Sequence, residues 1–326
     1  MRTTEPWILS VLLALGLCGA AHVAPTQAQQ KATVVFSAGP TGGTWTPMAA
    51  ATSDVVKRKF PEVDVQVEPG AALVNMEKIR TDKADLGWSM TTVLADARTG
   101  AGSWKGKQTD KPLLVATYYP VAWQLAVPAD SGIKSIADLR GKAVALPPRG
   151  NTSLSEGWEL LLRVHGMKLE DLGTRSHGSI SENVELIKNR QAVAMGWFTV
   201  VPASFALDLG SARPIRLLPV AEDKIAEMRT HNPGFVRHVI AKGMYAAQGM
   251  EAEVVTIQAP TILIASSKTP AEVVYKITRA IVEGREAFAH VAAVMKGVTG
   301  QQMAESFGLP RHPGAERYYR EAGLLK

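Results

Sequence analysis

Short apolar runs alternate with amphipathic, helix-like segments along most of the chain. The apolar runs have the length of strands and lie at residues 33–36, 63–67, 85–88, 113–117, 142–146, 192–197, 215–218 and 262–265. Helical patterns lie at residues 73–80, 154–165, 270–283 and 287–294, and a further helix is expected after Pro202. Strands that alternate with helices in this way predict an α/β fold with a largely parallel sheet.

Capping residues support several of these helices. Ser135, followed three residues later by Asp138, resembles a capping box and predicts a short helix. Gly166 is expected to end the helix over residues 154–165. Residues 222–258 are polar and show no clear pattern, apart from a turn at Asn232-Pro233-Gly234.

The sequence SAGPTGGTWTP, residues 37–47, follows the first apolar run. Its glycines, Gly42 and Gly43 among them, allow another group to approach the backbone closely. Pro47 suits the first position of a helix, with Thr46 as the N-cap. Free backbone N–H groups and the helix dipole make such a loop a candidate anion site, and an ordinary turn between strand and helix is the alternative. The spacing is that of neither a P-loop nor GxGxxG.

Loops of the same kind follow three other predicted strands. They lie at residues 68–75, which contain Gly70, at residues 88–92, which contain Thr91 and Thr92, and at residues 147–153, which contain Gly150. Ligands of open α/β sheets bind at the carboxyl ends of strands, so we expect these loops to gather around one site. Helix N-termini there would hold a carboxylate, and the guanidinium of Arg149 would add a two-pronged contact.

Of the tryptophans at positions 45, 88, 123, 158 and 197, three are candidate site residues. Trp45, Trp88 and Trp197 each lie at or near a strand end beside a loop, where they would form either core or the wall of a pocket. Trp158 lies in the middle of a predicted helix and is expected in the core. Trp104 is expected outside the ligand cleft.

The N-terminal segment has the pattern of a signal peptide. The apolar run over residues 7–17 follows Arg2 and is too short to span a bilayer. Small residues follow it, and a cleavage site is predicted after Ala28, so residues 1–28 are assigned as the signal peptide. Lipidation at Cys18 is the alternative, although Leu17 stands where lipoprotein signals carry a small residue. About 300 residues remain, which is typical of two domains.

Composition and motifs argue against catalysis, metal binding and nucleic-acid binding. The single cysteine lies in the predicted signal peptide, so the mature chain has no thiol nucleophile, disulfide or cysteine ligand. GxSxG and HExxH motifs are absent from the sequence. The histidines lack the spacing of metal ligands. Glu156, Glu159 and Glu182 are expected on the solvated faces of helices. The net charge is +6, but the basic residues are scattered. We therefore predict a protein that is not an enzyme and needs no cofactor or metal.

Four motifs resemble, in this order, one family of transport proteins. TGGTWTP, ADLGWS, DLRGKAVALPPRGNTS and HPGAERYYREAG are similar to the TAXI-type solute receptors of tripartite ATP-independent periplasmic (TRAP) transporters, over about residues 31–325. The resemblance implies a periplasmic binding protein type II fold, in which two α/β lobes close on a ligand. It also implies delivery of the ligand to a TRAP membrane permease driven by an ion gradient.

The resemblance further implies which residues contact the ligand. Gly42, Gly43, Thr44 and Trp45 match the family's first loop, Gly70 and Asn75 the second, Thr91 and Thr92 the third, and Gly150, Asn151 and Thr152 the fourth; Trp88, Arg149 and Trp197 complete the predicted site. Family members are associated with glutamate, glutamine and 2-oxoglutarate. Here Ala72, Met90 and Val193 stand where the family carries polar residues, so we predict a small organic anion with an apolar or aromatic part.

The same resemblance to TAXI-type receptors indicates how the chain is divided into lobes. Lobe 1 is expected to comprise residues 29–120 and 260–326, and lobe 2 residues 121–259, joined by extended crossovers near residues 119–127 and 253–265. Pro313 and Gly314 are expected to turn the chain, and Tyr318 and Tyr319 to pack a last helix on the first lobe. We expect a periplasmic monomer. A receptor of an ABC importer with the same fold and a periplasmic enzyme are the alternatives.

Overall fold

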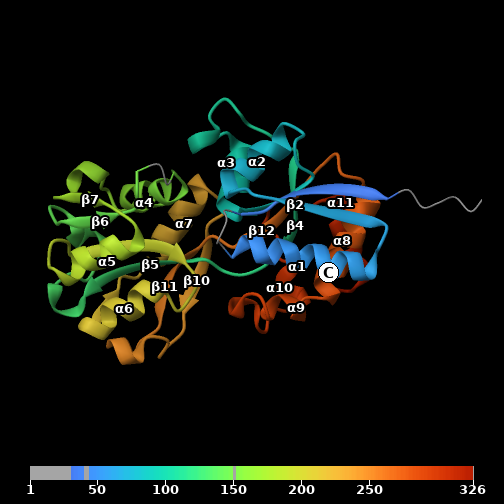
Figure 1. Cartoon of the computed structure of the whole chain (residues 1–326). Coiled ribbons are helices and arrows are strands. Elements are labelled where there is room, and N and C mark those ends of the chain that lie inside the picture. The colour runs from blue at the N-terminus through green and yellow to red at the C-terminus, as the bar shows by residue number, and fades with distance from the viewer. Residues whose placement is uncertain (1–30, 40–43, 150–151, 326) are drawn as a thin grey trace, which may run out of the picture. The chain divides into compact units, whose positions relative to one another are not determined.

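Two mixed β-sheets with helices on both faces organise the chain (Figure 1). The structure is a computed structural model that describes residues 31–39, 44–149 and 152–325, with only the backbone described at positions 152 and 153. We call the part built on the first sheet the first lobe and the part built on the second sheet the second lobe. None of the helices in the described ranges is long and apolar enough to cross a membrane.

The first sheet has five strands in the order β2-β1-β3-β12-β4. Their bounds are β1 Ala32–Ser37, β2 Val63–Glu68, β3 Leu86–Met90, β4 Pro112–Thr117 and β12 Thr261–Ser266. The edge strand β2 alternates buried and exposed positions in its first half, whereas every residue of β12 is buried. This contrast is typical of an edge strand and of a strand covered on both faces.

The second sheet has seven strands, in the order β10-β11-β5-β8-β6-β7 with β9 paired to β5. Their bounds are β5 Ala122–Pro128, β6 Val144–Leu146, β7 Arg175–His177, β8 Ala194–Thr199, β9 Ile215–Leu217, β10 Val236–Ile240 and β11 Val254–Gln258. All seven residues of β5 are buried at the centre of this sheet.

The prediction of a largely parallel sheet is wrong. Strand β1 pairs in parallel with β2 and β3, and β6 with β7 and β8. Strands β5 and β12 instead run antiparallel to their neighbours. The reason is topological: β12 returns to the first sheet from the second lobe, and β5 enters the second sheet from the first, so neither is placed by a helical crossover.

Helices cover both faces of each sheet. Their bounds are α1 Trp45–Lys59, α2 Ala72–Arg80, α3 Thr91–Thr99, α4 Thr152–Val164, α5 Ile180–Lys188, α6 Ser204–Ala212, α7 Glu222–His231, α8 Ala271–Glu283, α9 Glu286–Ala289, α10 Gly300–Met303 and α11 Pro313–Glu321. Short 3-10 turns are η1 Gly102–Trp104, η2 Ala129–Ser131, η3 Ile136–Leu139, η4 Leu169–Asp171, η5 Ala246–Gln248 and η6 Ala293–Met295. Buried side chains of α1 and α8 share one core with the first sheet, and those of α2 and α3 form another. In the second lobe, α4 and α7 contribute to one core, and α5 and α6 to another.

Several element boundaries differ from the sequence prediction. Helix α1 begins at Trp45 with Thr44 as its N-cap, so Thr46 and Pro47 lie inside its first turn. The single helix expected over residues 287–294 is interrupted, because Ala292 has extended backbone angles (φ −139°, ψ 111°) between α9 and η6. Pro313 occupies the first turn of α11 rather than a turn before it. Residues 222–258, which gave no pattern, contain α7, β10 and β11.

Two neighbouring segments connect the lobes. Backbone hydrogen bonds of 2.9 Å run from Thr261 N to Tyr119 O, from Tyr118 N to Thr261 O and from Ala259 N to Val121 O. The stretch leading into β5 therefore pairs with the stretch leading out of β11. Short paired segments of this kind are suited to absorb the dihedral changes of a hinge.

The C-terminal helix α11 packs on the first lobe through buried side chains. Tyr319 is fully buried, and its hydroxyl donates to the carbonyl oxygens of Val115 (3.1 Å) and Met303 (3.0 Å). His312, which is 1% exposed, caps the helix: its Nδ1 accepts from Gly314 N, and its Nε2 lies 3.2 Å from Thr269 O. This pairing requires a neutral imidazole with the proton on Nε2. Burial lowers the pKa of His312.

We expect the contribution of His312 to stability to be lost as the pH falls below about 6.5, the ordinary pKa of histidine. Because the pKa of His312 is lower in the folded state, the unfolded chain takes up its proton first, and the loss continues until the folded-state value is passed. Urea unfolding at pH 7.5 and 5.5 measures the loss, and His312→Asn should reduce it. An equal pH dependence in the variant would exclude His312 as a cause.

Candidate functional site

A cavity of about 470 Å³ lies between the two lobes. The first lobe supplies side chains from the starts of α1 and α2, the end of β3, helix α3 and turn η1. The second lobe supplies side chains from α4, the end of β8, the end of α7 and the segment after it. The paired connecting segments contribute Tyr119, Val121, Ala259 and Thr261. The cavity is therefore placed where a relative motion of the lobes would open or close it.

Aromatic and aliphatic side chains make most of the wall. Trp45 and Trp197 line it from opposite lobes, and the Nε1 of Trp45 donates to the Tyr119 hydroxyl over 3.1 Å. Phe198 stacks on Phe235 with ring centroids 5.9 Å apart. Such a wall suits the apolar body of a small molecule.

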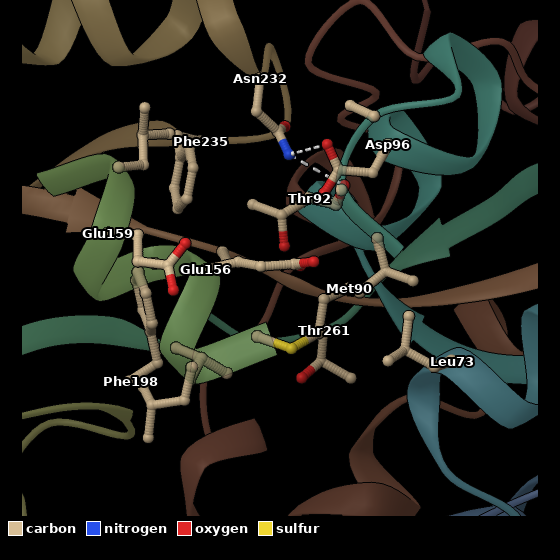
Figure 2. A pocket seen from close by; sticks show the side chains of 18 of the residues that line it. Leu73, Met90, Thr92, Asp96, Glu156, Glu159, Phe198, Asn232, Phe235 and Thr261 are labelled. Carbon is tan, nitrogen blue, oxygen red and sulfur yellow. Dashed lines mark hydrogen bonds between the residues drawn. The ribbon is translucent and has the colours of Figure 1, made fainter. Parts of the chain in front are cut away.

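Asn232 connects the two lobes beside the cavity. Its Nδ2 donates to the Asp96 carboxylate (2.8 Å) and to the Thr92 carbonyl oxygen (3.1 Å), both on α3 of the first lobe (Figure 2). Its Oδ1 accepts from Gly234 N in its own loop at 2.8 Å. The side chain is 6% exposed, so these bonds form away from water.

The backbones of the two lobes come into direct contact at Gly234. The hydroxyl of Thr91 donates to the Gly234 carbonyl oxygen over 2.6 Å. A Cβ atom at Gly234 would lie only 2.3 Å from the carbonyl oxygen of Thr91 and 2.5 Å from Thr92 N. Only glycine permits this approach without a shift of the backbone.

Carboxylates from both lobes face the cavity. Figure 2 shows Glu156 of α4 reaching towards the side of the cavity that carries Thr92 and Asp96. Oε1 of Glu156 accepts from the backbone N–H (3.1 Å) and the hydroxyl (2.9 Å) of Ser103, which follows α3. Burial, and next the charge of Glu156, raise the pKa of Asp96 to about 7, although the hydrogen bond from Asn232 opposes the shift.

The described lining is acidic apart from one exposed arginine. Asp96, Glu156 and Glu159 contribute carboxylates, Arg163 contributes the guanidinium, and His231 lies nearby at the end of α7. In the described ranges, no group of three or more His, Cys, Asp or Glu side chains could hold a metal ion. The cavity therefore offers a ligand a space with an apolar wall and a few polar contacts.

The sequence profile of the NMT1-like family matches residues 36–323. The chain belongs to the NMT1-like family. Two solved structures share its fold, and one of them is a solute-binding protein. A TctC solute-binding protein from Polaromonas aligns with a TM-score of 0.54 at 11% identity, over 92% of this chain and 100% of that one. The protein XAC2383 from Xanthomonas citri, bound to ATP, aligns with a TM-score of 0.51 at 11% identity, over 90% of this chain and 97% of that one.

Three of the predicted site residues line the cavity of this NMT1-like protein. They are Trp45, Thr92 and Trp197. Trp104, expected outside the cleft, also lines the cavity, because η1 folds back beside α3. The glutamates Glu156 and Glu159, expected on a solvated helix face, line it as well.

Other predicted site residues support the loops of the NMT1-like protein from inside the first lobe. Nδ2 of Asn75 donates to the carbonyl oxygens of Ala38 and Trp88, each over 2.7 Å. A Cβ at Gly70 would lie 2.0 Å from Oδ1 of Asn75, so this glycine leaves room for the amide. Asn75, Trp88 and Thr91 are all fully buried and do not line the cavity.

The remaining predicted residues lie on the surface or outside the described ranges. Thr44 and Arg149 are exposed and do not line the cavity. Gly42, Gly43, Gly150 and Asn151 lie outside the described residues, and Thr152 begins α4 without a described side chain. Sequence reasoning missed Asp96, Phe198, Asn232 and Phe235. The turn at residues 232–234 was the only local signal near this group.

Proposed function

We propose that the protein is an extracytoplasmic solute receptor that binds a small organic anion between its lobes and delivers it to a membrane permease. The observation that carries this proposal is the cavity of about 470 Å³, which both lobes line. Its volume lies in the range of small-molecule sites, and its wall has the usual composition of aromatic surface with a few polar groups. Membership of the NMT1-like family and the fold shared with TctC support the same conclusion.

We place the anionic end of the ligand away from the carboxylates of the cavity. Thr44 and Trp45 follow the first loop, and the fourth loop leads into α4 at Thr152. Backbone N–H groups at two helix starts would stabilise a carboxylate there, as predicted for Gly42, Gly43, Gly150 and Asn151. The guanidinium of Arg163 at the cavity is a second source of positive charge, in addition to Arg149.

The proposed partner is a TRAP permease, as the TAXI-like motifs imply, and the proposed location is the periplasm. We also propose that the lobes divide at residues 120/121 and 259/260. This division keeps the strands of each sheet within one lobe. An ABC importer with the same type of receptor is the second candidate. A neighbouring gene for a multi-spanning TRAP permease, rather than for an ATPase, would favour the TRAP transporter.

Mass spectrometry of small molecules released from the periplasmic protein, followed by calorimetry with each, tests the proposal. We expect one organic acid, bound at one molecule per protein and recovered unchanged. Chemical turnover of the ligand, or tight binding of none of the released compounds, would contradict a receptor function.

Thr44→Val and Thr152→Val are each expected to weaken binding by about ten- to a hundredfold. Each removes one hydroxyl from the proposed anion site, and a hydrogen bond to a charged group contributes about 1.5–3 kcal/mol. Thr81→Val, at the exposed end of α2, is the matched control and should bind like the parent. If both site variants also bind like the parent in calorimetry, the anion does not bind at the starts of α1 and α4.

A further inference from the structure

The carboxylates of the cavity raise a problem for any anionic ligand. Asp96, Glu156 and Glu159 would repel a second negative charge or an oxygen-rich group, and in the described lining only Arg163 carries a fixed positive charge. A carboxyl group that holds its proton removes one of these charges and gains a hydrogen-bond donor. The question is which of the three is placed to do so.

Asp96 has the environment of a proton-holding group. It lies half-buried on α3, in contact with the second lobe. One oxygen, Oδ1, accepts from Asn232, and in the described part of the chain Oδ2 has no hydrogen-bond partner. Glu156, in contrast, has one oxygen satisfied by both the N–H and the hydroxyl of Ser103, which stabilises its ionised form.

The negative charge of Glu156 acts in the same direction as the burial of Asp96. From α4, the carboxylate of Glu156 disfavours a second charge at Asp96, and burial does so more strongly. Glu159 and Arg163 of α4 and His231 of α7 line the same cavity. Helix α2 and turn η1, which pack against α3, contribute only uncharged residues to the lining: Leu73, Gly102 and Trp104.

We propose that Asp96 is a specificity-determining residue whose protonated carboxyl donates a hydrogen bond from Oδ2 to an acceptor oxygen on the ligand. The inference rests on the proposed function. It narrows the ligand to an organic acid with a second acceptor at the far end of its apolar body: a carbonyl, a hydroxyl or another carboxylate. The proton comes from water, so above about pH 7, where the free carboxyl group is mostly ionised, binding the anion takes up a proton.

Calorimetry with the released organic acid between pH 6 and 8, in buffers of different ionisation enthalpy, tests this. Because the pKa of Asp96 is about 7, the wild-type affinity should fall by up to about tenfold across this interval, with net proton uptake that grows towards pH 8. Asp96→Asn supplies a permanent N–H donor and should bind with a nearly flat pH profile. Asp223→Asn, on the exposed start of α7, should keep the wild-type profile.

Glu156→Gln provides an independent variant. It removes the charge that raises the pKa of Asp96, so the fall in affinity should begin at a lower pH. A wild-type affinity that does not change with pH would overturn the role of Asp96 and leave the receptor function intact. A folded Asp96→Asn protein with the wild-type pH profile, or without binding at any pH, would overturn it too. Failure of the wild-type protein to bind an organic acid at any pH would refute the proposed function itself.

Discussion

Gly234→Ala is expected to weaken ligand binding by about a hundredfold while both lobes still fold. The new Cβ would lie 2.3 Å from the carbonyl oxygen of Thr91 and 2.5 Å from Thr92 N, which are backbone atoms of the other lobe. These atoms cannot move aside as a side chain would, so the arrangement in which the lobes meet at Gly234, which we take to be the closed one, becomes costly. A receptor whose closed state is a hundredfold less populated loses about the same factor in apparent affinity.

Small-angle scattering and calorimetry measure this effect together. The wild-type radius of gyration should decrease on ligand addition, and that of Gly234→Ala should stay at the unliganded value. Gly300→Ala is a suitable control, because its Cβ would meet only side-chain atoms, of Leu324 at 3.2 Å and of Val282 at 3.3 Å, and no backbone of the other lobe. Wild-type affinity in Gly234→Ala would show that closure at this contact is not part of binding.

Trp88→Ala is expected to destabilise the protein by about 3–5 kcal/mol, the usual cost of truncating a fully buried aromatic side chain. Trp88 is 0% exposed, packs edge-on against Tyr118 with centroids 4.5 Å apart, and donates from Nε1 to the Trp45 carbonyl oxygen over 3.0 Å. Removing it leaves a cavity in the core beneath the first loop.

Trp197→Ala is the contrasting variant. Trp197 is only half-buried and lines the ligand cavity, so its truncation should cost less stability and weaken binding by about tenfold, the effect of removing part of an apolar wall. Urea unfolding and calorimetry on both variants separate the two roles. Equal losses of stability would contradict the assignment of Trp88 to the core and Trp197 to the cavity.

Most strands and long helices of the fold could be predicted from local pattern. The apolar runs over residues 33–36 and 262–265 correspond to β1 and β12, and Ser135 with Asp138 forms the predicted capping box. These elements are specified by neighbours in the sequence. The missed helix α7 buries only Ile225 and Met228, so its sequence gives little apolar periodicity.

The cavity was harder to predict, because its contacts join residues distant in sequence. Asn232 was visible only as part of a turn, yet its amide binds Asp96, which precedes it by more than a hundred residues. Glu156 has the sequence context of a solvated helix face and reaches the cavity only because α4 meets η1 of the other lobe. Local sequence carries no signal for such pairings.

A crystal structure of the protein with its released organic acid would test the central claim most directly. The account predicts ligand density inside the cavity, with its apolar part between Trp45 and Trp197 and an acceptor oxygen within hydrogen-bond distance of Asp96. Density at another place on the protein, with this cavity empty and the Asn232–Asp96 contact unchanged, would contradict it.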